Sequence, residues 1–204
     1  MTNKIDFKKS LKPFYNPPLI GFHIVDVPVM NFLMVDGIGD PNTSIEYQHA
    51  VESLYSMSYG IKFELKSQGF DYVVPPLEGL WWMPDMAEFN LENKTSWQWT
   101  MMIMQPERVT QGIVEKVRNK IEKKGIIEAG FQGKFEIFHE GIAVQIFYSG
   151  AYENEAPVIA QMHRFIVENG YRLSGKHHEI YLSDPRKTAP EKLKTILRQP
   201  VKLD

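Results

Sequence analysis

The segment "KHHEIYLSDP" places a carboxylate and a phenol two residues apart in a run that is typical of a β-strand. Side chains alternate along a strand, so Glu179 and Tyr181 share one face with His177, while His178 points the other way. A carboxylate in an apolar strand costs on the order of several kcal/mol when it is desolvated without a partner. Glu179 therefore either lies in solvent on an edge strand or faces a wet site. In such a site, Glu179 and Tyr181 are our candidate catalytic residues.

All four tryptophans lie between positions 81 and 99, in the segments "PPLEGLWWMPD" and "SWQWTMMIMQP". Large aromatic side chains on strands either fill a core or form the wall of a site for flat ligands. Because tyrosines and methionines lie nearby, we predict an adaptable aromatic site for a flat or cationic organic molecule. The candidate ligand-binding residues are Trp81, Trp82, Trp97, Tyr148 and Tyr55.

Strand alternation separates the two adjacent tryptophans, so only one of them faces such a site. Matching "LWWMPD" to "IYLSDP" favours Trp81, whereas alternation from Glu78 favours Trp82, and both alternatives stay open. Glu78 also leaves two interpretations, a solvent position or a site position. We expect Glu179 rather than Glu78 to face the tryptophan wall.

The first half of the chain predicts one strand, one helix and two further strands. The segment "IVDVPVMNFLMVDGIG" is rich in β-branched and aromatic residues and ends in a glycine turn, which predicts a strand near 28–36. The next segment has a capping box at Thr43 and Glu46 and a helical period of apolar residues. Strands near 76–83 and 96–105 follow, joined by the polar loop "PDMAEFNLENKT".

The second half repeats this order after a connector helix near 107–124. "FEIFHEGIAVQIFYSGAY" predicts a strand, "ENEAPVIAQMHRFIVENGY" a helix, and "KHHEIYLSDP" and "LKTILRQPV" two more strands. One helix covers only one face of a sheet, so two such units must pack together. We predict an α+β fold of duplicated β-α-β-β modules, with antiparallel sheets, helices on one side and a shared central ligand cleft. The domains are an N-terminal arm at 1–19 and a ligand-binding domain at 20–204, with repeats at about 20–105 and 133–204.

Composition excludes several classes of protein. The formal net charge is −2, so no strong positive field attracts nucleic acid or an anionic membrane. The lysines of "VEKVRNKIEKKG" alternate with glutamates, which indicates a solvated helix face. No apolar run is long enough to span a membrane, and the N-terminus lacks a signal peptide. Since cysteine is absent, disulfides and thiol chemistry are excluded, and we expect a cytoplasmic protein.

The motifs of the common cofactor and hydrolase sites are missing. The six histidines show no metal-ligand spacing, and "GIGDPN" lacks the third glycine of a dinucleotide loop. There is no phosphate loop and no G-x-S-x-G nucleophile elbow. We therefore expect no metal and no organic cofactor.

The repeated element order, the strand "HHEIYLSDP" and the ending "SDPRKTAPEKLKTILRQPV" resemble the GyrI-like small-molecule-binding family over roughly residues 20–204. The resemblance implies SHS2-like modules and a ligand carboxylate in a Glu-x-aromatic pattern, which Glu179 and Tyr181 match. Multidrug-responsive members of the family carry a DNA-binding module. No helix-turn-helix segment is present here, so we expect no direct binding to nucleic acid.

The segment "PPLEGLWW" resembles a narrower group of stand-alone members, the cyclopropanoid cyclopropyl hydrolases. This resemblance implies a cofactor-independent hydrolase that opens the cyclopropane of DNA-alkylating natural products in an aromatic cage and so protects the cell. Glu179 would orient or deprotonate the attacking water, and the hydroxyl of Tyr181 or Tyr148 would donate to the developing oxyanion.

Two alternatives remain from other functional classes. The protein either binds or senses planar hydrophobic xenobiotics without turnover, as multidrug-type binding proteins do, or it inhibits a large partner such as a topoisomerase. The second alternative has little support, because no conspicuous charged or apolar surface segment stands out. Both a monomer and a dimer are compatible with the sequence.

Overall fold

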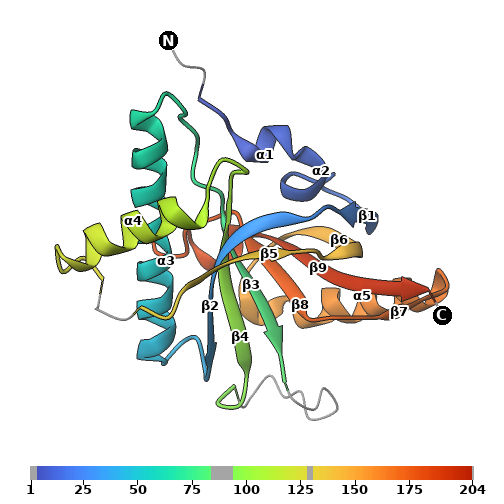
Figure 1. Ribbon diagram of the computed structural model, residues 1–204. Coiled ribbons are helices and arrows are strands. Elements are labelled where there is room, and N and C mark those ends of the chain that lie inside the picture. Colours follow the sequence, from blue (N-terminus) through green and yellow to red (C-terminus); the bar gives the residue numbers. More distant parts are fainter. Residues whose placement is uncertain (1–3, 84–93, 128–130, 204) are drawn as a thin grey trace. The chain divides into compact units, whose positions relative to one another are not determined.

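The computed structural model describes residues 4–83, 94–127 and 131–203 (Figure 1). The chain is an α+β protein in which helices alternate with antiparallel strands, as predicted. It divides into two compact units. Unit 1 comprises Met1–Phe7, Met30–Pro75 and Trp81–Phe138, and unit 2 comprises Lys8–Val29, Pro76–Leu80 and His139–Asp204.

The described residues form five α-helices and nine strands. The helices are α1 (Phe7–Ser10), α2 (Lys12–Tyr15), α3 (Ile45–Ser67), α4 (Gln111–Glu122) and α5 (Ala156–Glu168), with short 3-10 turns at Tyr152–Asn154 and Pro190–Lys192. The strands are β1 (His23–Val27), β2 (Met30–Ile38), β3 (Leu77–Trp82), β4 (Gln98–Gln105), β5 (Lys134–Phe138), β6 (Gly141–Ser149), β7 (Tyr171–Leu173), β8 (His177–Tyr181) and β9 (Lys194–Leu203). In the described ranges, no helix combines the length and apolar character that a bilayer crossing needs.

The predicted order of strand, helix, strand and strand occurs twice. It appears as β2, α3, β3 and β4, and again as β6, α5, β8 and β9, with β7 as an additional short strand in the second series. The helix α4 lies between the two series in the chain. Most of the predicted loop "PDMAEFNLENKT" lies outside the described residues.

The prediction of a single strand across "FEIFHEGIAVQIFYSGAY" is wrong. Gly141 has a φ of 73°, a conformation that glycine adopts easily, and the chain turns there between β5 and β6. The two strands then join different units: β5 pairs with β2 in unit 1, and β6 pairs with β1 and β9 in unit 2. The strand β1 was not predicted, although it lies within the bounds of the first repeat, and it supplies an edge strand to unit 2.

In unit 1, the antiparallel strands β5, β2 and β4 lie side by side, and α3 packs on them (Figure 1). The strand partner of Gly37 is Trp99, whose indole occupies the space that a Cβ at position 37 would need. α4 packs against α3, where Gly60 allows Val117 to approach closely.

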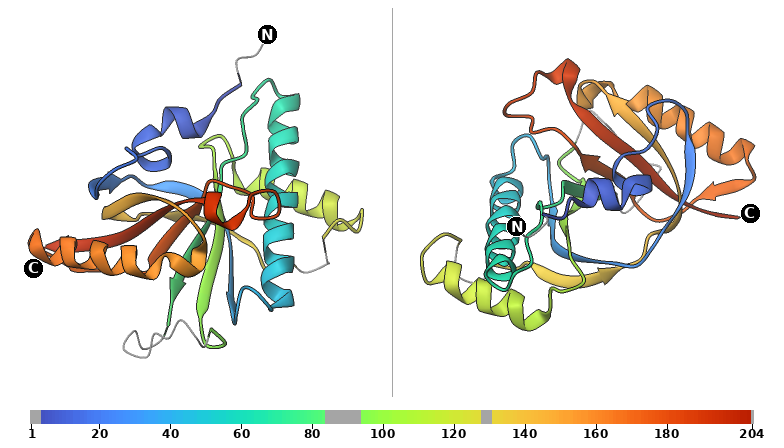
Figure 2. Two further views of the ribbon diagram at one scale, coloured as in Figure 1. Left: turned by 180° about the vertical axis from the view of Figure 1, so that it is seen from behind. Right: turned by 90° about the horizontal axis from the view of Figure 1, so that it is seen from above.

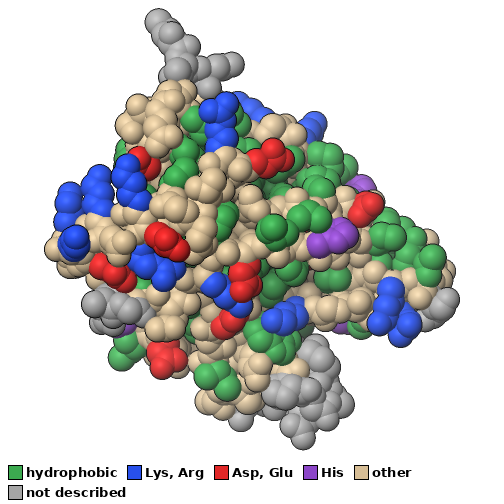
Figure 3. All heavy atoms as spheres, viewed as in Figure 1, with side chains coloured by type: hydrophobic (Ala, Val, Ile, Leu, Met, Phe, Trp, Pro, Cys, Tyr) green, Lys and Arg blue, Asp and Glu red, His purple; other side chains and the backbone are tan. Residues whose placement is uncertain are grey.

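The outer face of α4 carries the basic run noted in the sequence. Its lysines at positions 116, 120, 123 and 124 are exposed, and the blue side chains of this region gather over the end of α4 in Figure 3. The apolar residues Val114, Val117 and Ile121 are buried. This arrangement is the solvated face of an amphipathic helix, as predicted.

In unit 2, β1, β6, β9 and β8 form an antiparallel sheet in that order, with β7 beside the far end of β9. α5 covers one face (Figure 2), where Met162 and Ile166 pack on Val144, Leu197 and Val201. The segment around α2 covers the opposite face: its Tyr15 forms a buried cluster with two sheet residues, Ile180 and Ile196.

A network of buried charges lies between this sheet and α2. His178 donates from Nδ1 to Glu140 at 2.8 Å and from Nε2 to Glu78 at 3.0 Å. Tyr15 donates to the second oxygen of Glu78 at 2.7 Å, and Arg198 donates to the second oxygen of Glu140 at 2.9 Å. All five side chains are at most 1% exposed.

The same network also holds the backbone of α2. The guanidinium of Arg198 donates further to the carbonyl of Phe14 at 2.6 Å and to the amide oxygen of Gln145 at 3.0 Å. Gln145 in turn donates to the carbonyl of Pro13 at 2.6 Å. Two carboxylates balance two cations, and every charged group has hydrogen-bond partners, which is the condition under which buried charges are tolerated.

The network requires His178 to be an imidazolium, since only that form donates from both ring nitrogens. Burial by itself lowers the pKa of His178, but the charges of Glu140 and Glu78 and the hydrogen bonds to them outweigh burial and raise it to about 9. Burial raises the pKa of Glu140, but His178 and Arg198 together lower it to about 2. Burial, followed by the charge of Glu78, raises the pKa of Tyr15, so this phenol stays a donor.

The close contact at Gly37 yields a stability prediction. Gly37→Ala places a methyl group where the Trp99 indole lies, so we expect the free energy of unfolding to fall by about 1–3 kcal/mol, the usual cost of overpacking a core. Gly112→Ala is the matched control, because the nearest atom to a Cβ at this helical glycine is Oγ1 of Thr110 at 4.0 Å, and alanine should stabilise the helix by about 0.5–1 kcal/mol. Urea unfolding of both variants measures the difference. Equal stabilities would contradict the close packing of Trp99 on Gly37.

The buried imidazolium yields a pH prediction. Because the folded pKa of His178 lies near 9 and the unfolded value near 6.5, its contribution is complete below pH 6.5 and is lost as the pH rises through about 9. We expect the free energy of unfolding to fall by on the order of 3 kcal/mol across this window, measured by urea unfolding at successive pH values.

His178→Gln should remove this pH dependence and lower stability at pH 7 by roughly 3–5 kcal/mol, because it leaves two buried carboxylates without their shared donor. The exposed His139 supplies the control, and His139→Gln should keep the wild-type slope. A wild-type stability that is constant between pH 6.5 and 9 would show that His178 is not charged in the folded protein.

Candidate functional site

The candidate catalytic pair lies on β8, on the face that α5 covers. Tyr181 donates its hydroxyl to Oε2 of Glu179 at 2.8 Å. Oε1 of the same carboxylate lies 3.6 Å from Nε2 of His177, and the side chains of His177 and Glu179 are only 13% and 16% exposed. Glu179 is thus neither a free surface carboxylate nor a fully sealed one, and it has a phenol on one oxygen and an imidazole beside the other.

Cross-strand pairing brings further residues to the same face. Thr195 of β9 lies opposite both Tyr181 of β8 and Tyr148 of β6, and directly opposed residues of antiparallel strands share a face. The ring of Tyr152, just before α5, meets the ring of Tyr181 edge-on at 5.7 Å between centroids. The Glu179 carboxylate therefore has aromatic neighbours within unit 2.

Alternation along β8 places the buried charge network on one face of the strand and the candidate catalytic pair on the other. His178 faces the buried network on the α2 side, and its neighbour Glu179 faces α5. Since the network anchors β8 through His178, it also fixes which residues of this strand face α5. A shift of one residue would exchange the two faces.

Tyr148, predicted to bind ligand, is part of the face covered by α5. Its hydroxyl donates to the carbonyl of Ala151 at 2.9 Å. Burial, followed by the nearby charge of Glu155, raises the pKa of the Tyr148 hydroxyl, so it stays protonated. Two of the tyrosine hydroxyls at this site are thus donors that already have acceptors in the protein.

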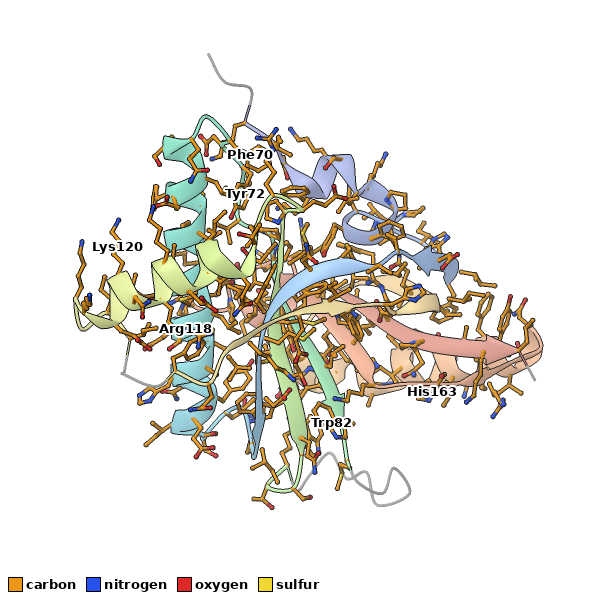
Figure 4. All side chains as sticks on the ribbon, in the orientation of Figure 1. Phe70, Tyr72, Trp82, Arg118, Lys120 and His163 are labelled. Atoms are coloured by element: carbon orange, nitrogen blue, oxygen red, sulfur yellow. The ribbon has the colours of Figure 1, made fainter. Side chains whose placement is uncertain are left out.

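The tryptophans form an aromatic cluster in unit 1. The ring of Trp81 packs edge-on against Trp97 at 5.8 Å and lies 6.1 Å from Tyr47 of α3. Tyr47 also meets Trp99 edge-on at 5.3 Å. Trp81 and Trp99 are almost fully buried, whereas Trp82 at the end of β3 is half-buried (Figure 4).

The structure thus brings some of the predicted residues into direct contact. Glu179 and Tyr181 are in direct contact, and Trp81 contacts Trp97. Tyr55 lies on α3 and stacks on Tyr59, with 6.5 Å between the ring centroids. The residues that sequence reasoning did not select are Tyr47, Trp99, Tyr152, His163, His177 and Thr195.

The missed residues have no common sequence signal. His177 shares the alternation that singled out Glu179 and was noted as a neighbour, but its approach to the carboxylate depends on side-chain positions. Thr195 and Tyr152 join the site only through strand pairing and a turn. Among the described residues, no three His, Asp or Glu side chains are grouped as ligands for a metal ion.

Comparisons with known proteins agree with this architecture. Residues 22–202 match the GyrI-like small molecule binding domain. An uncharacterized conserved protein from Listeria innocua is 45% identical, with a TM-score of 0.90, over 98% of this chain and 100% of that chain. A hydrolase from Listeria innocua is 43% identical, with a TM-score of 0.88 and the same coverage.

More distant structures share the fold alone. The C-terminal domain of EcmrR is 13% identical, with a TM-score of 0.57, over 92% of this chain and 100% of that domain. A search among curated proteins found no significant match. The family match covers nearly the whole chain, from β1 to β9, and the chain therefore belongs to the GyrI-like small molecule binding domains.

Proposed function

We propose that this protein binds planar hydrophobic compounds and hydrolyses reactive ones, with the cyclopropane of DNA-alkylating natural products as the substrate group. The observation that carries the proposal is the contact of Glu179 with Tyr181 on a largely buried face that also bears Tyr148 and Tyr152. Two findings support it: the family binds small molecules, and a structure at 43% identity is a hydrolase.

Glu179 acts as the base in this proposal. Before the substrate binds, the hydroxyl of Tyr181 donates to Oε2, which orients the carboxylate and leaves Oε1 to accept a hydrogen bond from water. The restricted exposure of the carboxylate strengthens its interaction with a bound water relative to bulk solvent. Aromatic rings beside it stack on a flat substrate and hold the reacting carbon near that water.

The reaction on a cyclopropane conjugated to a dienone is balanced with water alone. The water oxygen forms a bond to a ring carbon, and the C–C bond to that carbon breaks. Its electron pair moves into the dienone and reaches the carbonyl oxygen, which becomes a phenolate. The water proton passes to Glu179, and the phenolate takes up one proton from solvent. Because the strained ring is already reactive, a base and a hydrogen-bond donor suffice.

Tyr181 links substrate recognition to the strength of the base. Without ligand, its hydroxyl donates to Glu179 and thereby lowers the basicity of the carboxylate. A substrate carbonyl that accepts this hydrogen instead stabilises its own developing oxyanion. Glu179 then loses a donor and becomes the stronger base when the substrate is in place.

The base assignment predicts the behaviour of Glu179→Gln. We expect turnover of a cyclopropane-bearing alkylator, followed by mass spectrometry, to fall by about 10²–10⁴-fold, the usual contribution of a general base. Binding should persist because glutamine keeps the shape of the side chain. Glu191→Gln, an exposed carboxylate of the same unit, is the matched control and should keep wild-type turnover.

The outcomes separate the two functional classes. Equal turnover by Glu179→Gln and wild type would remove Glu179 from the mechanism. Tight binding by the wild-type protein with no product at long times would leave the second candidate, a protein that binds or senses the ligand without turnover.

The tryptophan cluster predicts a fluorescence response. We expect a planar dye such as acridine to quench tryptophan emission on binding, and we expect Trp81→Phe to reduce this quenching more than Trp82→Phe. The reason is that Trp81 shares an aromatic cluster with Trp97 and Tyr47, which suits stacking of a flat ring. Quenching by bound dye that is equal in both variants would assign the cluster to the core instead.

A further inference from the structure

Two histidines of unit 2, His177 and His163, take no part in the proposed chemistry. Nε2 of His177 lies 3.6 Å from Oε1 of Glu179, the carboxylate oxygen that Tyr181 leaves free. In the part of the chain that the structure describes, neither ring nitrogen of His177 has a hydrogen-bond partner, and Nε2 of His163 has none either. Buried polar atoms without partners are rare in folded proteins and call for an explanation.

His163 continues the line from His177 towards the outside of α5. It lies on α5 (Figure 4), and its imidazole interacts electrostatically with His177. Together with Arg164, Val167 and Glu168, His163 lines an open hollow of about 360 Å³ on the helix. The side chains of Glu179, His177 and His163 therefore lead from the candidate base to an outer surface of unit 2.

The chemistry of these groups suits proton transfer. Burial, followed by the neighbouring His177, lowers the pKa of His163, which is therefore a neutral imidazole at pH 7. A neutral imidazole accepts a proton on one nitrogen and releases one from the other. Glu179 must lose the proton it takes from water before the next turnover, and its free oxygen faces His177.

We propose that His177 takes this proton from Oε1 of Glu179 and that His163 passes it to solvent at the hollow on α5. The proposal rests on the proposed hydrolysis. The protons are balanced. One proton leaves the attacking water and reaches solvent through Glu179, His177 and His163, and the phenolate oxygen of the product takes one proton from solvent. No oxidant, metal or further reactant is required.

Both uncharged and titratable side chains surround this route. The β9 residues opposite Glu179 and Tyr181 are uncharged, namely Leu197 and Thr195. The titratable groups that surround the route are Tyr181 on β8, Tyr148 on β6, Tyr152 and Glu155 before α5, and Arg164 and Glu168 on α5. His178, Glu140 and Arg198 belong to the network on the opposite face.

The decisive test is chemical rescue of turnover. With a cyclopropane-bearing alkylator as the probe, we expect His177→Ala and His163→Ala to lower kcat by about tenfold or more and to change KM by less than about twofold. Imidazole added to the buffer should restore a large part of kcat, because a small base can replace the missing group. His139→Ala, an exposed histidine of the same unit, should show neither effect.

A substrate-free measurement tests the coupling of the two rings. His163 is titrated by NMR in the wild-type protein and in His177→Gln, where the pKa of His163 should rise because the neighbouring imidazole that lowers it is gone. An unchanged titration of His163 would show that the two imidazoles do not interact, and this result would overturn the proposed proton transfer from His177 to His163.

The results of these experiments distinguish failure of the proton route from failure of the proposed hydrolysis. If Glu179→Gln abolishes turnover while both histidine variants keep wild-type kcat, or lose kcat without rescue by imidazole, the route is overturned and Glu179 remains the base. If Glu179→Gln is fully active, or if the wild-type protein shows no turnover, the proposed hydrolysis fails and the route fails with it. Circular dichroism checks that each variant is folded.

Discussion

The imidazolium of His178 between Glu78 and Glu140 is the interaction on which unit 2 depends. Those three side chains are sealed from solvent, so the two carboxylates are tolerated only while the ring keeps both protons. With Arg198, they join β3, β6, β8, β9 and the backbone of α2 through charge-assisted hydrogen bonds. Such a network contributes specificity, because any other pairing of these segments would leave a buried charge without a partner.

The candidate site is a consequence of that anchoring. His178 and Glu179 are adjacent in the chain, yet they serve different surroundings, a sealed network and a partly exposed pair with Tyr181. A β-strand is the only regular element in which neighbours are separated so completely. The positions of the two histidines at 177 and 178, which look equivalent in the sequence, therefore have unrelated physical roles.

Each unit takes a strand from outside its own repeat. The turn at Gly141 sends β5 to unit 1 and β6 to unit 2, and β1 reaches the edge of the unit 2 sheet from the N-terminal side. Sequence periodicity does not reveal such an exchange, because each strand satisfies the same alternation whichever partner it has. Only long-range pairing chooses the partner.

Local patterns were sufficient for the α+β class, the repeated element order and the pairing of Glu179 with Tyr181, since period and spacing alone place side chains on a face. They were insufficient for Glu78, which alternation left between solvent and site and which is a sealed partner of Tyr15 and His178. The same limit applies to Trp99 and His163. Their surroundings are made by segments far apart in the chain, and a residue's burial and charge depend on what packs against it rather than on its neighbours in sequence.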